Sequence, residues 1–402
     1  MSSTRTLDPV FSGLPAMAQL FVSLLGRLRH GHVLLIGPGG EQKIFGDPHS
    51  QPGARLVIND WRACGYILRS GDIGFAEAYR QSWVNSPDLA QLLRLAMRNE
   101  DALGQTVNGS ALMRLWYGFL HRLRPNTRRG SRKNIHAHYD IGNAFYTLWL
   151  DETWSYSSAL FDGNYAMSLE QAQARKYQNL IDGLGLRAGM RVLEVGCGWG
   201  GFALHAARQG IFVDGITIST AQAEIARERI SKEGLDDKAQ IRLCDYRDTQ
   251  GQYDAVVSIE MFEAVGERFW PVYFKTIHDR LKPGASAMIQ SITIEESRFD
   301  SYRTSSDFIR QYIFPGGMLP TPERFLEHAR DAGLQGSVNV AFGKDYAETL
   351  RRWARAFDDQ LDKVQAQGFD EEFIRLWSLY LAYCEAGFDE GRTDVIQFTL
   401  KK

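Results

Sequence analysis

The segment VLEVGCGWGG at residues 192–201 constrains the fold more than any other part of the chain. An apolar run, interrupted only by Glu194, leads into a turn with glycine at positions 196, 198, 200 and 201. This pattern is typical of a buried strand that bends sharply into a helix. Because glycine has no Cβ, the backbone of such a turn lets a ligand approach closely. The segment therefore predicts a ligand-binding turn at the end of a strand.

From residue 190 onward, apolar strand-like segments alternate with helical segments. We expect strands at 191–195, 211–219, 239–246, 253–262 and 285–294, and helices at 202–210, 220–234 and 268–284. Apolar strands separated by helices predict a parallel sheet covered by helices on both faces. Residues 394–402 read as a closing strand that is antiparallel and lies at the edge of the sheet. The predicted fold class is α/β, with a mostly parallel, doubly wound sheet.

The first third of the chain has a different pattern. Apolar residues at helical spacing predict a helix over 14–29, residues 32–46 read as a hairpin, and residues 54–60 read as a further strand. Helical segments follow, so we interpret residues 1–120 as a small N-terminal α+β domain. Residues 135–402 then form the main domain.

Residues 121–134, between these two parts, contain several cations, no acid, one proline and one glycine. This composition indicates a linker. It is either a solvated connector or a patch that meets anionic phosphate head groups, because clustered cations gain about 1 kcal/mol each near an anionic leaflet. The cations at its centre are Arg128, Arg129, Arg132 and Lys133.

Composition and charge narrow the function classes. The formal net charge is −2, so no global basic field points to a nucleic-acid partner. The four cysteines lie far apart without C-x-x-C spacing, which argues against a disulfide framework or a zinc site. No run of about 18 apolar residues occurs, and no signal peptide is recognisable. We expect a cytoplasmic protein without a bound metal that associates peripherally with the inner face of the membrane.

The glycine turn fits two ligand classes equally well. Gly196, Gly198 and Gly201 match the G-x-G-x-x-G pattern of dinucleotide-binding folds, with Asp214 about the right distance onward for a ribose. With Gly200 in place of Gly201, the same turn is similar to that of S-adenosylmethionine (SAM) methyltransferases. The turn alone does not decide between them.

Three features of the flanking sequence favour SAM. Asp214 lies within the second expected strand, and the carboxyl end of that strand carries Thr217 and a capping box from Ser219 to Gln222. The third strand ends in CDYRD, where Asp245 is placed to accept a hydrogen bond from an adenine amino group. No second mononucleotide-binding half follows. The residues expected to bind SAM are Tyr156, Ser157, Gly196, Cys197, Gly198, Thr217, Gln222, Asp245, Tyr246, Arg247 and Ile259.

Several longer stretches resemble the cyclopropane-fatty-acid synthase and mycolic-acid methyltransferase family. They lie at 134–161, 192–201, 216–222, 258–274, 312–320 and 342–353, with a weaker match at 71–89. The resemblance implies a seven-stranded SAM methyltransferase fold. It also implies an enzyme that transfers a methyl or methylene carbon to the cis double bond of an unsaturated phospholipid acyl chain. A homodimer is the assembly that the family's full-length synthases often adopt.

The chemistry implied by the resemblance passes through a carbocation that must then lose a proton. Two products are open: ring closure gives a cyclopropane, whereas a hydride shift before proton loss gives a methylene- or methyl-branched chain, as in tuberculostearic-type relatives. Aromatic side chains near the expected site either stabilise the cation or belong to the core. They are Tyr139, Phe145, Tyr146, Trp149, Trp154, Tyr156, Tyr312 and Phe314.

In this family a bound bicarbonate commonly serves as the base, held by a glutamate, a histidine, a tyrosine and a cysteine-containing turn. Glu263 and Tyr346 match the glutamate and the tyrosine, whereas Ser158 replaces the cysteine and Gln290 replaces the histidine. Serine and glutamine still donate hydrogen bonds, but Gln290 does not titrate. Bicarbonate, water and Glu263 itself therefore remain alternatives for the proton acceptor.

Two other functions are compatible with the sequence. One is a SAM methyltransferase for a soluble small molecule, and the other is a catalytically silent lipid-binding protein with the same fold. The basic linker and the amphipathic N-terminal helix favour a lipid substrate over a soluble one. The glycine turn and Glu263 are both present, which favours an active enzyme.

Overall fold

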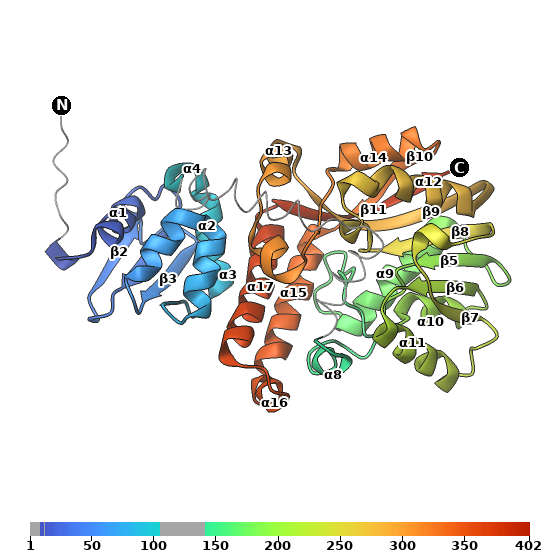
Figure 1. The fold of residues 1–402 in the computed structure, drawn as a ribbon, viewed down its shortest axis with the longest axis horizontal. Coiled ribbons are helices and arrows are strands. Elements are labelled where there is room, and N and C mark those ends of the chain that lie inside the picture. The colour runs from blue at the N-terminus through green and yellow to red at the C-terminus, as the bar shows by residue number, and fades with distance from the viewer. Residues whose placement is uncertain (1–8, 12, 105–140) are drawn as a thin grey trace.

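The computed structural model describes residues 9–11, 13–104 and 141–402. An N-terminal unit and a larger unit lie on either side of two long helices, α15 (Gly343–Asp358) and α17 (Glu371–Asp389) (Figure 1). The predicted linker at 121–134 and Tyr139 lie outside the described residues. Within the described ranges, no helix combines the length and the apolar character that crossing a membrane requires.

The N-terminal unit is a small four-stranded sheet with helices, as predicted. Its strands have the order β2-β1-β3-β4, with β1 antiparallel to β2 and parallel to β3. The predicted hairpin and third strand are confirmed, whereas the first helix is shorter than expected and the two-residue β4 was not predicted. The elements are α1 (Ala16–Leu25), β1 (His32–Ile36), β2 (Gln42–Gly46), β3 (Gly53–Ile58), α2 (Arg62–Arg80), β4 (Val84–Asn85), α3 (Leu89–Arg98) and α4 (Glu100–Leu103).

The larger unit is built on a seven-stranded sheet with the order β10-β11-β9-β8-β5-β6-β7. The five strands from β9 to β7 are parallel, and β11 is antiparallel to both of its neighbours. This arrangement confirms the predicted doubly wound, mostly parallel fold. The strands are β5 (Arg191–Val195), β6 (Phe212–Thr217), β7 (Ala239–Leu243), β8 (Tyr253–Ile259), β9 (Leu281–Ile294), β10 (Gln335–Ala341) and β11 (Thr393–Lys401).

Helices cover both faces of this sheet. On one face α9, α10 and α11 enclose an apolar core, and on the other face α12 and α14 enclose a second core. Helix α9 begins with a capping box, because Ser168 and Gln171 each bind the backbone N–H of the other. The helices are α8 (Asn143–Tyr146), α9 (Leu169–Leu184), α10 (Gly201–Ala207), α11 (Thr220–Lys232), α12 (Trp270–Arg280), α13 (Glu296–Thr304), α14 (Pro322–Asp331) and α16 (Leu361–Ala366), and a π-helix spans Ile309–Ile313.

Two sequence-based expectations about this unit are wrong. The closing strand β11 is antiparallel as expected, but it lies between β9 and β10 rather than at the edge. The edge strand β10 was not predicted, because QGSVNVA is mostly polar or small and its side chains are largely exposed. The helix expected over 268–284 ends at Arg280. Pro283 and Gly284 lie near the start of the strand β9 instead.

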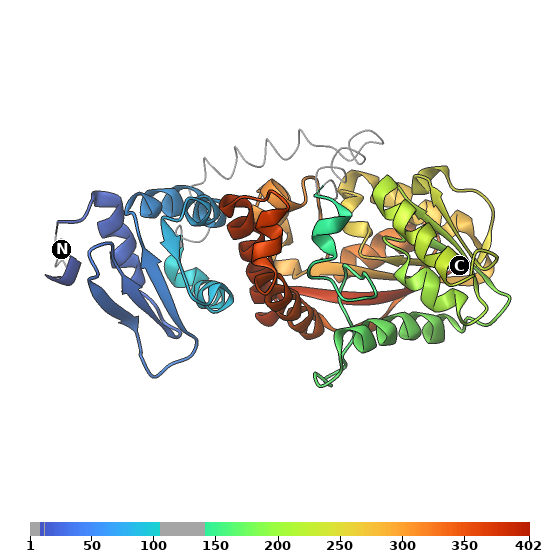
Figure 2. The same cartoon turned by 90° about the horizontal axis from the view of Figure 1, so that it is seen from below.

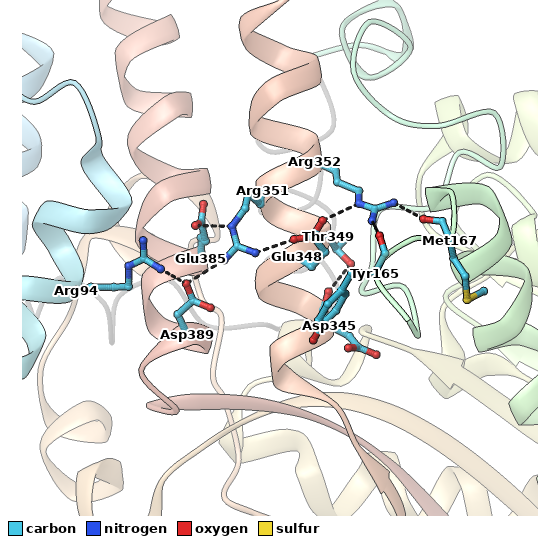
Figure 3. A network of polar contacts seen from close by, with 10 residues as sticks. All are labelled: Arg94, Tyr165, Met167, Asp345, Glu348, Thr349, Arg351, Arg352, Glu385 and Asp389. Carbon is cyan, nitrogen blue, oxygen red and sulfur yellow. Dashed lines mark hydrogen bonds and ion pairs between the residues drawn. The ribbon is translucent and has the colours of Figure 1, made fainter. Parts of the chain in front are cut away.

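Helices α15 and α17 join the two units through an apolar core and a chain of ion pairs (Figures 2 and 3). Arg94 of α3 binds the carboxylate of Asp389 on α17, and Arg351 of α15 binds the same carboxylate at 3.0 Å. Arg351 also binds Glu348 at 2.7 Å and Glu385 at 3.1 Å. The N-terminal unit is therefore held against the same helices that carry part of the site described below.

We expect the Asp389→Asn substitution to lower the free energy of unfolding by roughly 1–3 kcal/mol, because two partly buried arginines lose a charged acceptor. Urea denaturation measures this change. As the matched control, Asp237→Asn removes a carboxylate that pairs with Lys238 and is 68% exposed, and it should leave the free energy of unfolding nearly unchanged. Equal effects of the two substitutions would contradict a structural role for the Asp389 network.

Candidate active site

A cavity of about 1030 Å³ lies at the carboxyl ends of β5, β6 and β8 and extends toward the N-terminal unit. This edge is where doubly wound sheets bind ligands. All eleven residues predicted to bind SAM line the cavity: Tyr156, Ser157, Gly196, Cys197, Gly198, Thr217, Gln222, Asp245, Tyr246, Arg247 and Ile259. The fold therefore brings into one cavity predicted residues that lie up to 103 positions apart in the sequence.

The glycine turn has the backbone that its sequence predicts. Gly196, Gly198 and Gly200 have φ angles of +83°, +51° and +82°, which side chains rarely adopt. The N–H groups of Gly196 and Cys197 both donate to the carbonyl of Ile216 at 2.9 Å, which fixes the turn on β6. A Cβ at Gly198 would meet no protein atom within 4 Å, so this part of the turn faces open space in the cavity.

The dinucleotide interpretation does not fit this geometry. Asp214 points to Arg191 at 3.2 Å and Arg242 at 3.8 Å and does not line the cavity. A Cβ at Gly201 would lie 2.4 Å from the hydroxyl of Tyr177, so this glycine is needed for packing against α9 rather than for a pyrophosphate. The G-x-G-x-x-G match is therefore coincidental.

The rim beside β6 and β7 is held by its own hydrogen bonds. Arg247 donates to both oxygens of Asp245, at 2.8 Å from Nε and 2.6 Å from Nη2, which fixes the planar guanidinium beside the cavity. Ser219 caps α11 by accepting from the N–H of Gln222 at 3.3 Å. The reciprocal half of the predicted capping box is replaced, because the Gln222 carboxamide accepts from Thr217 at 3.1 Å instead.

Glu194 supplies a test of whether the cavity fits SAM. Its side chain lines the cavity beside the glycine turn, and among the described residues its Oε2 atom has no hydrogen-bond partner. Burial raises the pKa of Glu194 to about 8, partly offset by the charge of Lys176. A buried carboxyl oxygen without a partner fits a ligand that brings its own cationic donor, and SAM carries an ammonium group.

Three of the four predicted catalytic residues, Ser158, Gln290 and Tyr346, converge on a residue that sequence reasoning missed. Glu260 follows β8, and its Oε1 accepts from the N–H of Ser158 at 2.8 Å and from Nε2 of Gln290 at 2.7 Å. Its Oε2 accepts from the hydroxyl of Tyr346 at 2.7 Å. Glu260 and Tyr346 line the cavity, whereas Ser158 and Gln290 are fully buried behind it.

Glu260 and Glu263 have different electrostatic surroundings. Burial raises the pKa of Glu260, but the hydrogen bond from Tyr346 and the charge of Lys176 lower it. Burial and the neighbouring charge of Glu260 raise the pKa of Glu263 to about 8. Glu263 accepts from the N–H of Ile292 at 2.5 Å and from the hydroxyl of Ser291 at 3.1 Å through a single oxygen. The net pKa of both carboxyl groups is therefore raised by burial, and hydrogen bonds from Tyr346, Ser158 and Gln290 oppose the shift at Glu260.

Lys176 is the second residue that sequence reasoning missed. It lies on the buried face of α9 and donates to Ser157 at 2.7 Å and to Gln173 at 2.5 Å. Burial lowers its pKa to about 8, while the charges of Glu260, Asp151 and Glu194 oppose that shift. The sequence signal that could have revealed it is the position of Lys176 among the residues that form the buried face of α9.

The predicted aromatic residues divide into two groups. Trp154, Tyr156 and Phe314 line the cavity. Phe145, Tyr146 and Trp149 are buried in the core between α8 and the α15–α17 pair. Tyr312 does not line the cavity, and its hydroxyl binds Glu77 of α2.

The fold and the site define a SAM-dependent methyltransferase. Residues 126–398 match the family model described as mycolic acid cyclopropane synthetase, and the chain belongs to this family. It is 39% identical over 352 residues to a tuberculostearic acid methyltransferase of Mycobacterium tuberculosis, covering 83% of this chain and 80% of the relative. It is 31% identical to the cyclopropane-fatty-acyl-phospholipid synthase of Escherichia coli K12, covering 80% and 81%.

A solved mycolic acid cyclopropane synthase, complexed with SAH and CTAB, has the same fold with a TM-score of 0.62. It is 30% identical and covers 67% of this chain and 98% of the other. Together the comparisons establish an enzyme that methylates or cyclopropanates fatty-acyl lipids and depends on SAM.

We expect Gly198→Ala to weaken SAM binding by roughly tenfold, because the new methyl group projects into the cavity. Calorimetric titration with SAM measures the change. Gly185→Ala is the matched control: Gly185 also has a positive φ of +61° and open space around a Cβ, but it lies outside the cavity. Each variant should lose about 1–2 kcal/mol of stability from backbone strain. Unchanged SAM affinity in Gly198→Ala would refute the assignment of the glycine turn to SAM binding.

The raised pKa of Glu263 has a consequence for stability. The folded state keeps its proton up to about pH 8, whereas the unfolded chain releases it near pH 4.5, so stability is lost as the pH rises between these values. We expect Glu263→Gln to reduce this loss by about 1 kcal/mol or more between pH 5 and 8. Urea denaturation at a series of pH values measures it, with the exposed Glu224→Gln as control. Parallel pH profiles of variant and wild type would show that Glu263 is already ionised at pH 5.

Proposed function

We propose that this enzyme transfers the methyl carbon of SAM to the cis double bond of an unsaturated phospholipid acyl chain. The observation that carries this proposal is the continuity of the cavity. The same cavity is lined by the glycine turn, by Glu260 and Tyr346, and by apolar side chains of the N-terminal unit. The latter include Phe21, Leu25, Leu56, Ile67, Leu92 and Leu95.

The shape and lining of this cavity suit a long apolar chain. A soluble acceptor would need only the part beside the glycine turn, whereas the apolar surfaces of α1, α2 and α3 extend the cavity well beyond it. Burying an acyl chain there gains about 25 cal/mol per Å² of apolar surface removed from water. The relative named as a cyclopropane-fatty-acyl-phospholipid synthase supports the same substrate class.

The residues of the chain are suited to a cationic intermediate. SAM, when bound, supplies a methyl group on a positively charged sulfur. Tyr156 is held rigidly, with its ring 5.4 Å from Trp353 and its hydroxyl 2.8 Å from that of Tyr380. The rings of Trp154, Tyr156 and Phe314 present faces that attract positive charge. The apolar wall excludes the water that would otherwise capture the cation.

We infer that the product is methylene-branched rather than cyclic. The relative named as a tuberculostearic acid methyltransferase is 39% identical, compared with 31% for the relative named as a cyclopropane synthase. A hydride shift followed by loss of a proton from the added carbon gives a methylene branch without any further reagent. Conversion to a saturated methyl branch needs a reductant and is left to a separate enzyme.

We also propose that the enzyme associates peripherally with the membrane. A phospholipid substrate requires contact with the bilayer, and the basic segment 121–134 is suited to anionic head groups at the inner face. That segment lies outside the described residues, so the support comes from its composition. A homodimer stays a prediction.

We expect purified protein to move the labelled methyl carbon of SAM into monounsaturated phospholipid in vesicles, and each product chain to gain one CH2 unit. Mass spectrometry of the extracted lipid measures this gain, and proton NMR separates an exocyclic methylene from a cyclopropane ring. Vesicles of fully saturated phospholipid are the control and should stay unlabelled. Label found only in soluble acceptors would contradict the substrate class, and no label in any acceptor would favour a silent lipid-binding protein.

A further inference from the structure

Glu260 occupies a position that resembles a binding site for a small anion. Two backbone or amide donors and one hydroxyl, from three separate parts of the chain, point at one carboxylate. The donors belong to Ser158, Gln290 and Tyr346, the residues expected from the sequence to surround a bound bicarbonate. The chain therefore fills this place with a side chain of its own. We propose that the carboxylate of Glu260 accepts the proton that the acyl chain loses, in place of a dissolved anion.

The donors around Glu260 are fixed before any substrate arrives. The Gln290 carboxamide is oriented because its oxygen accepts from Nε2 of Gln397 on β11 at 3.0 Å. Ser158 and Gln290 are both fully buried, so neither exchanges its partner for water. Hydrogen bonds to the charged form stabilise a carboxylate as an anion. These donors therefore favour Glu260 as the proton acceptor.

The backbone at Glu260 is in a conformation that glutamate seldom adopts. Its φ angle is +50°, in the left-handed region, which is unfavourable for a residue with a Cβ. The conformation is held by the hydrogen bond from the Glu260 N–H to the carbonyl of Gln290 at 2.8 Å. Such strain persists where the surrounding structure enforces it, and it clusters at functional sites. Here it turns the carboxylate toward Tyr346 and the cavity wall.

Glu263 is less suited to the same task. It lines the same cavity and accepts from Ile292 and Ser291 through one oxygen, but burial and the nearby charge of Glu260 raise its pKa and favour its protonated form. Two carboxyl groups whose surroundings separate their protonation states take different roles. Glu263 is then a neutral acid that limits the local negative charge, and Glu260 is the base.

The step balances without an additional reagent, and it rests on the proposed function. The C–S bond of SAM breaks with its electron pair staying on sulfur, while the π pair of the alkene forms the new C–C bond. For the methylene branch, a hydride first shifts from the methyl-bearing carbon to the neighbouring cationic carbon, and the added methyl then loses a proton to Glu260 as its C–H pair forms the exocyclic double bond. Without the shift, the same proton loss lets the C–H pair close a three-membered ring onto the cationic carbon. Glu260 returns the proton to solvent before the next turnover.

The test is the Glu260→Gly variant, because glycine adopts a φ of +50° without strain and leaves the three donors with an empty anion site. In CO2-free buffer, we expect wild-type turnover to be unaffected and that of the variant to fall roughly 10²–10⁴-fold. Its SAM affinity should change by less than about threefold, since Glu260 is not required for the glycine turn. Added bicarbonate or formate should raise the turnover of Glu260→Gly at least about tenfold.

Two further measurements keep the outcome clear. Glu260→Gln fills the site with a neutral group, so it should be as slow as Glu260→Gly but not rescued by either anion. Carbon-13 NMR titration with labelled bicarbonate should detect binding to Glu260→Gly and none to the wild type, whether or not either protein methylates lipid. A wild-type enzyme that needs bicarbonate, or a Glu260→Gly variant within tenfold of wild-type turnover, would overturn the inference. If the wild type is inactive on lipid but bicarbonate still binds only to Glu260→Gly, the proposed substrate is wrong and the assignment of Glu260 to the anion site stands.

Discussion

The hydrogen bonds to Glu260 connect several separate parts of the fold. The carboxylate follows β8, yet its partners come from the segment before α9, from β9 and from α15, and Gln290 extends the network to β11. A buried carboxylate without such partners would be strongly destabilising. The sheet, α15 and the segment at 154–161 must therefore assemble together, and the site is complete only when they have done so.

The chemistry follows from how charge is distributed around this carboxylate. Apolar and aromatic side chains share the cavity lining with Glu260, while burial raises the pKa of Glu263 to about 8 and lowers that of Lys176 to about 8. Electrostatic interactions are stronger between buried groups than between groups in water. A single negative charge next to a transient cation stabilises that cation and then receives its proton. The same isolation explains why several groups here have shifted pKa values.

Much of the fold could be predicted because its signals are local. The alternation of strand and helix from residue 190, the glycine turn and the N-terminal hairpin each depend on short patterns, and all three are confirmed. The edge strand β10 escaped because edge strands are polar and exposed, so they lack the apolar signal of a buried strand. The order of β10 and β11 depends on pairing between segments about 60 residues apart, which no local pattern encodes.

The candidate site could be predicted only in part for a related reason. SIEMFEAVG contains two glutamates, and the family resemblance pointed only to Glu263. The importance of Glu260 depends on Ser158, 102 residues earlier, and Tyr346, 86 residues later. No spacing rule connects positions that far apart. The exchange of cysteine and histidine for Ser158 and Gln290 was visible in the sequence, and its explanation required the fold.

The most direct test of the account is the isotopic composition of the lipid product. Wild-type enzyme is given SAM with a trideuterated methyl group, monounsaturated phospholipid vesicles and buffer freed of CO2. We expect acyl chains that carry the new carbon with two deuterons, because the third is lost to a carboxylate of the protein. Unlabelled lipid, or label that appears only after bicarbonate is added, would contradict it.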